Sequence, residues 1–161
     1  MSPNPAEFIR HLRSKGYHSR SNKHSNALAE AIVRDLAASC PLIGERFAKG
    51  QLVYDLNFKL RAGSSDWNVD LVLGPPPLDG EPPSDGGPTR ARPSAIQIAI
   101  EIKSVMTEHR KAVKNRKRDL EAHHEHVHNY ASNAIAAGVL VVNAAGRFKS
   151  PLRRQPTIQR K

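Results

Sequence analysis

The chain has 161 residues, which is the length of a single domain. It carries 25 lysines and arginines against 15 aspartates and glutamates, and the formal net charge of +10 favours a polyanionic partner such as nucleic acid. A single cysteine excludes an intrachain disulfide, and no apolar run approaches the ~20 residues of a membrane span. These features predict a cytoplasmic protein that does not enter a membrane.

The N-terminal part of the chain predicts a basic segment followed by a helix. Residues 1–24 are polar and basic, and residues 18–24 have no hydrophobic periodicity. An apolar stripe at helical spacing then predicts a helix that begins near Ser25 or Asn26 and is stopped by Pro41. The stripe consists of Leu28, Ile32 and Leu36.

Two alternating segments predict a β-hairpin. In residues 51–60 every second residue is apolar and faces the same side of the strand, namely Leu52, Tyr54, Leu56, Phe58 and Leu60. The polar turn 63–66 leads to a second strand over residues 67–73. Asp70 and Asn68 lie on one face of that strand, opposite an apolar face made of Trp67, Val69, Leu71 and Leu73.

The remaining elements alternate between strand and helix. Residues 74–93 are rich in proline and glycine and predict a long surface loop or a disordered insertion. A strand follows over residues 94–104, then a long helix over 107–133, whose rough core stripe is Val113, Leu120, Val127 and Ala131. Residues 138–143 have the β-branched composition of a central strand, and 146–161 form a basic tail.

Charged residues interrupt one face of the strand over residues 94–104. Isoleucines occupy the other face, while Glu101 and Lys103 stand side by side on the polar one. If the strand that carries Asp70 lies alongside, two carboxylates converge, and such a pair binds a hard divalent cation such as Mg²⁺. A neighbouring lysine can help to activate an attacking water. The alternative interpretation is a solvated strand face with an ordinary Glu–Lys ion pair.

The order of these elements resembles the PD-(D/E)xK nuclease superfamily, which includes many restriction endonucleases. The resemblance covers about residues 25–145 and rests on Asn68-Val-Asp70-Leu-Val and Ala99-Ile-Glu101-Ile-Lys103-Ser, with Val69 where the family name places a proline. It implies an α/β fold with a restriction-endonuclease-like core, in which a mixed central sheet is flanked by helices.

The resemblance also implies roles for individual residues. Asp70, Glu101 and the backbone carbonyl of Ile102 would hold Mg²⁺, and Lys103 would position or activate the attacking water. Members of the family often add an acidic residue from the first helix. Glu30 is the candidate here, although it could equally be a surface glutamate.

The helix over residues 107–133 begins with a run of basic residues that can follow a phosphate backbone. These residues are Arg110, Lys111, Lys114, Lys117 and Arg118. A solvated helix face is the alternative. His124 and His128 have a spacing that zinc sites use, but without an evident third ligand they are expected to be surface histidines.

The sequence thus predicts a Mg²⁺-dependent DNA endonuclease, with a restriction-type enzyme as the first choice. A Holliday-junction resolvase, a repair nuclease and a non-catalytic basic DNA-binding module with the same fold are the alternatives. Cleavage of a duplex needs two active sites or two passes of one, and a homodimer would supply the two.

Overall fold

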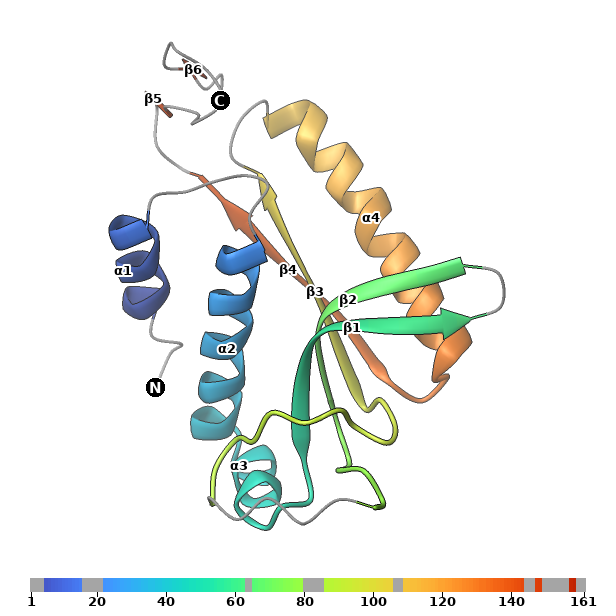
Figure 1. The fold of residues 1–161 in the computed structure, drawn as a ribbon. Helices are drawn as coiled ribbons and strands as arrows, with labels where there is room; N and C mark the ends of the chain where they lie inside the picture. Colours follow the sequence, from blue (N-terminus) through green and yellow to red (C-terminus); the bar gives the residue numbers. More distant parts are fainter. Residues whose placement is uncertain are drawn as a thin grey trace.

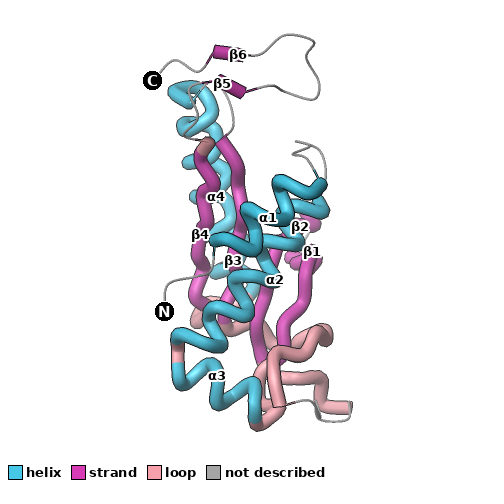
Figure 2. Tube along the Cα trace, turned by 90° about the vertical axis from the view of Figure 1, so that its left-hand side faces the viewer, coloured by secondary structure: helices cyan, strands magenta, loops and turns pink. Residues whose placement is uncertain are grey.

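A mixed β-sheet forms the middle layer of the protein, with helices on both of its faces (Figures 1 and 2). The structure is a computed structural model that describes residues 5–15, 22–62, 65–79, 86–105, 109–143, 147–148 and 157–158. Its elements, in chain order, are α1 (Pro5–Lys15), α2 (Asn22–Ser39), α3 (Pro41–Ala48), β1 (Val53–Ala62), β2 (Ser65–Gly74), β3 (Ile98–Val105), α4 (His109–Tyr130), β4 (Ile135–Val142), β5 (Arg147–Phe148) and β6 (Thr157–Ile158).

The main sheet has four strands in the order β1-β2-β3-β4. The hairpin of β1 and β2 is antiparallel, β2 pairs with β3 in the antiparallel sense, and β3 pairs with β4 in parallel. The parallel pair requires a crossover, and α4 provides it. This arrangement confirms the prediction of a mixed sheet flanked by helices. Within the described residues, no helix has the length and apolar character needed to cross a bilayer.

The two helical layers enclose separate apolar cores. On one face, Ala29 and Val33 of α2 and Phe47 of α3 pack with residues of the sheet that include Leu71 and Ile100. On the other face, α4 packs against a second cluster made of Phe58, Leu60, Val69, Val72, Ile96, Ala99, Val127 and Ala134. Figure 2 shows the same layering, with α2 in front of the sheet and α4 behind it.

The hairpin bends in its middle, and the bend corrects our prediction that its apolar residues share one face. Leu56 belongs to the apolar cluster beneath α2 and α3, whereas Phe58 belongs to the cluster beneath α4, which we call the α4 core. Between them Asn57 has a positive φ of 54°, a conformation that asparagine tolerates better than most residues. Its side chain is held by a 3.0 Å hydrogen bond to Asn26 of α2. The outer half of the hairpin therefore turns away from the inner half, as Figure 1 shows.

Two further predictions about elements need correction. The predicted central strand is β4, which pairs only with β3 within the described part of the chain. Its residues Ile135, Leu140 and Val142 are 62%, 41% and 52% exposed, because β-branched composition reports strand propensity and not position within a sheet. The basic N-terminal segment also contains a helix, α1, which is tied to α2 by an ion pair of 3.0 Å between Glu7 and Arg34.

The described parts of the proline-rich loop have no helix or strand, in agreement with the prediction. Residues 86–93 nevertheless touch β1, because Tyr54 exchanges two backbone hydrogen bonds with Thr89 and Ala91. Residues 80–85 of this loop lie outside the described residues, as does most of the basic tail.

Candidate active site

The residues predicted to hold a metal lie where β2 separates from β3. The backbone pairing between these strands ends with Leu71 opposite Ile100. Asp70 is the next residue of β2, and its Oδ2 accepts a 2.7 Å hydrogen bond from the backbone N–H of Ile102. This side-chain bond joins the two strands beyond their last paired residues, and it fixes the Asp70 carboxylate against β3.

Glu101 is the most deeply buried member of the group, since only 3% of the residue is exposed. Its Oε1 forms an ion pair with Nζ of Lys103, whose side chain is 25% exposed. The pair therefore extends from the interior to the surface. The structure thus brings together Asp70, Glu101 and Lys103, which lie as many as 33 positions apart in the sequence.

Burial controls the electrostatics of both carboxyl groups. It raises the pKa of Asp70 above its usual value, against the opposing effects of the Ile102 N–H and the Lys103 charge. Burial also raises the pKa of Glu101; the hydrogen bond from Lys103 opposes that rise, and the charge of Asp70 adds to it. One lysine thus faces two carboxyl groups, and a bound cation would stabilise the second negative charge.

Helix α4 adds a buried histidine that the sequence analysis did not include in the site. His123 is 1% exposed. Its Nε2 lies 3.4 Å from the carbonyl oxygen of Ala99, and its Nδ1 lies 3.9 Å from Oε2 of Glu101. Burial lowers the pKa of His123 and so favours the neutral ring. The available signal was its position between Leu120 and Val127 on the predicted core stripe, at helical spacing from both.

The atoms of this group suit a cation. Oε2 of Glu101 and Nδ1 of His123 are both buried, and neither has a hydrogen-bond partner among the described residues. Buried polar atoms are normally paired, so these two facing atoms form a place where a cation or a water molecule can bind. In the same described part of the chain, no three histidine, cysteine, aspartate or glutamate side chains already form a metal-binding group. Ile102, whose carbonyl was predicted as a ligand, holds Asp70 through its N–H.

No described hydrogen bond or ion pair joins Glu30 to this group, and its charge is not among those that shift the pKa of Asp70 or Glu101. Its helix α2 covers the apolar face of the sheet, whereas Glu101 faces α4 through His123. The charge of Glu30 acts instead on Tyr54. Burial raises the pKa of the Tyr54 phenol, and the negative charge of Glu30 raises it further. The structure therefore offers no geometric support for Glu30 as a third acidic residue of the site.

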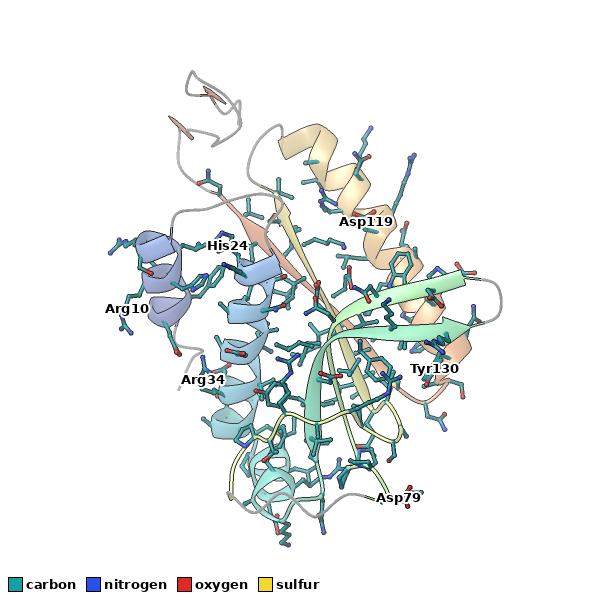
Figure 3. All side chains as sticks on the ribbon, viewed as in Figure 1. Arg10, His24, Arg34, Asp79, Asp119 and Tyr130 are labelled. Carbon is teal, nitrogen blue, oxygen red and sulfur yellow. The ribbon has the colours of Figure 1, made fainter. Side chains whose placement is uncertain are left out.

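The basic run begins helix α4. Lys114, Lys117 and Arg118 are exposed, and Lys117 makes a 3.5 Å ion pair with Glu121 of the next turn. A similar contact of 2.6 Å joins Arg116 to Asp119, which is labelled on α4 in Figure 3. Acidic residues one turn later thus relieve part of the like-charge repulsion. The side chains of Arg110 and Lys111 lie outside the described residues.

Three further histidines of α4 have structural contacts. His126 stacks on Trp67 with ring centroids 4.5 Å apart, which attaches the outer half of the hairpin to the helix. His128 lies 3.0 Å from the carbonyl oxygen of Ala134, and its ring meets that of His124 edge-on. These contacts agree with the expectation of surface histidines at positions 124 and 128.

The comparisons with known proteins give no relative. The chain matches no protein-family model, no curated protein and no solved structure. The function must therefore be argued from the geometry and chemistry of the chain itself.

Proposed function

We propose that the protein is a divalent-metal-dependent DNA endonuclease whose active site is formed by Asp70, Glu101 and Lys103. The observation that carries the proposal is the position of these side chains. The half-buried carboxyl group of Asp70, the buried carboxyl group of Glu101 and the Lys103 ammonium group converge where β2 and β3 separate. Burying two carboxylates against a single lysine costs stability, and such a cost is typical of functional sites.

Each residue has a distinct task in this mechanism. Asp70 and Glu101 hold the cation, which would supply charge neutralisation at the phosphate and make a nearby water more acidic. Asp70 is oriented by the Ile102 N–H, so its carboxylate does not have to be ordered when substrate binds. Lys103 keeps a positive charge beside Glu101 at the surface end of the group, where it can attract the phosphate and stabilise the developing negative charge.

The basic helix supplies the affinity for the polyanion. Lys114, Lys117 and Arg118 project from α4, the same helix that packs His123 against Glu101. A duplex that contacts this face would lie near the site, since both belong to one helix and the strand beneath it. Among nucleases, a restriction-type enzyme with a restriction-endonuclease-like core remains our first choice. A homodimer of such an enzyme would be able to cut both DNA strands in one encounter.

Cleavage of supercoiled plasmid tests the proposal. We expect nicking with Mg²⁺ or Mn²⁺, none with chelator, and none for Asp70→Asn or Glu101→Gln. The matched control is Asp79→Asn, which removes the same charge from an exposed loop at the lower end of the molecule in Figure 3. Full activity in chelator or in Asp70→Asn would reject the proposal.

The choice of DNA substrate separates the related functions. A restriction-type enzyme cuts linear duplex at defined positions, whereas a resolvase prefers a four-way junction. A non-catalytic DNA-binding module would bind duplex through Lys114 and Lys117 and cleave nothing with any divalent ion. That third outcome would retain the basic helix as a DNA contact and remove the catalytic role of Asp70 and Glu101.

A further inference from the structure

The contact between His123 and Glu101 contains two hydrogen-bond acceptors that face each other. Nε2 of His123 lies next to the carbonyl oxygen of Ala99, and a carbonyl can only accept a hydrogen bond. Nε2 must therefore carry the ring proton, which leaves a lone pair on Nδ1 of the neutral ring. That lone pair faces Oε2 of Glu101, itself an acceptor in the carboxylate.

Neither acceptor is satisfied by the protein. Both atoms are buried, and no described residue donates a hydrogen bond to either of them. Their separation of 3.9 Å is too long for a direct hydrogen bond. Two ligand atoms of a tetrahedral ion with bonds of about 2.1 Å lie about 3.4 Å apart, so a closure of about 0.5 Å would bring both atoms within reach of one ion.

We propose that Nδ1 of His123 and Oε2 of Glu101 are ligands of the same divalent cation, and that the nitrogen ligand gives this site a preference for a transition-metal ion over Mg²⁺. The inference rests on the proposed metal site and adds a ligand to it. Oxygen-only sites suit Mg²⁺, whereas an imidazole nitrogen favours later divalent ions such as Co²⁺ and Zn²⁺. His123 is held ready for this role by the Ala99 carbonyl, which fixes both its tautomer and its orientation.

The fold keeps His123 in place without help from an ion. Leu120, one turn before it, packs on Gly138 of β4, where a Cβ atom would lie 2.7 Å from Leu120 Cδ2. Val127, one turn after it, is fully buried in the α4 core. The two turns of α4 on either side of His123 are therefore anchored to the sheet, so loss of the imidazole is expected to change metal selectivity more than the position of the helix.

The test compares Co²⁺ and Mg²⁺ affinities, measured by calorimetry on the full chain and by competition. We expect His123→Gln, whose amide can still reach the Ala99 carbonyl, to lower the ratio of Co²⁺ to Mg²⁺ affinity by about tenfold or more. His123→Asn, which places an amide near the position of Nδ1, should bind both ions with a reduced preference. His124→Asn removes an exposed histidine from the next position of the same helix and should leave the ratio unchanged.

Two results would overturn the inference. One is a folded His123→Gln protein with the wild-type ratio, which would mean that a water molecule and not an ion joins the two acceptors. The other is loss of Co²⁺ binding in His124→Asn, which would place the ion at the surface pair of His124 and His128.

A measurement on the His124→Asn background avoids dependence on the folding of His123 variants. Ligation through Nδ1 leaves the Nε2 proton in place, so Co²⁺ should produce a paramagnetically shifted, exchangeable imidazole N–H signal in the NMR spectrum. Absence of that signal at saturating Co²⁺ would also overturn the inference.

The outcomes distinguish this inference from the proposed function. If Asp70→Asn and Glu101→Gln abolish metal binding while His123→Gln keeps the wild-type ratio, the metal site stands without His123. If the ratio depends on His123 but no DNA substrate is cleaved, the nitrogen ligand stands and the nuclease proposal fails.

Discussion

The two faces of the sheet are covered in different ways. Beneath α2 and α3 the buried residues are apolar, with Phe47 and Leu71 among them. Beneath α4 the apolar cluster gives way to Glu101 and His123, which retain unsatisfied polar atoms within the described part of the chain. Apolar burial stabilises the first face, whereas the second contains charges whose burial opposes folding. The fold can carry these buried charges because the apolar clusters on both faces supply stability.

The largest effect is expected on the apolar face. Phe47→Ala removes a side chain of a residue that is 1% exposed between α3 and the sheet, and should lower the free energy of unfolding by about 3–5 kcal/mol. Urea denaturation followed by circular dichroism measures this change. A loss below about 1 kcal/mol would mean that α3 contributes little to the core and that the contrast between the two faces is overstated.

A smaller effect is expected at the bend that allows the hairpin to serve both faces. Asn57→Ala places a residue that disfavours positive φ at 54° and removes the hydrogen bond to Asn26, so it should cost about 1–2 kcal/mol. Asn57→Gly loses the same hydrogen bond but tolerates the backbone angle, and should cost less. The two variants are compared by their thermal midpoints. Equal losses would assign the effect to the hydrogen bond alone.

A dependence of stability on pH is expected on the polar face. Burial raises the pKa of Glu101 above its usual 4.5, so the folded state binds this proton more tightly than the unfolded state. The contribution of Glu101 to stability therefore falls as pH rises from the usual value through the folded-state pKa. Glu101→Gln removes this fall, and the thermal midpoint of the variant should gain on the wild type as the pH rises above the usual carboxyl pKa in chelator.

The control for that experiment is Asp79→Asn, which changes net charge by the same amount at an exposed position. A difference between Glu101→Gln and wild type that stays constant over this pH range would contradict the assigned pKa direction. Saturation with a divalent ion should reduce the gain, because the ion stabilises the ionised carboxylate in the wild type.

The smallest effect on stability is expected on the exposed face of α4. Changing Lys114 and Lys117 together to Ala should leave the free energy of unfolding nearly unchanged, because both side chains are exposed. If both contact phosphate, the slope of log K against log salt should fall by about 1.8, or roughly 0.9 for each contact. Fluorescence anisotropy at several salt concentrations measures this slope. Lys49→Ala, at the residue that follows α3, is the control, and an unchanged slope in the double variant would place DNA elsewhere.

Local patterns predicted the elements that carry the site. The alternation around Asp70 and around Glu101 and Lys103 defines strand faces, and this alternation survives in β3. The prediction from alternation failed in the hairpin. Asn57 has a positive φ, and the apolar residues of β1 on either side of it point to opposite faces of the sheet. No periodicity encodes such a bend. His123 was missed for another reason: a histidine on an apolar helix stripe is indistinguishable from a packed core residue until its neighbour on β3 is known.

The contact between the proline-rich loop and β1 has a consequence for association between molecules. The outer edge of a sheet strand exposes backbone groups that can pair with a strand from another chain. At Tyr54 these groups are already used, since its N–H donates to the Thr89 carbonyl and its carbonyl accepts from the Ala91 N–H. The parallel bridge between Tyr54 and Arg90 thus shields this point of the β1 edge. A segment that resembles a spacer in the sequence therefore acts as a barrier to edge-to-edge aggregation, and shortening it should make the protein prone to aggregate before it unfolds.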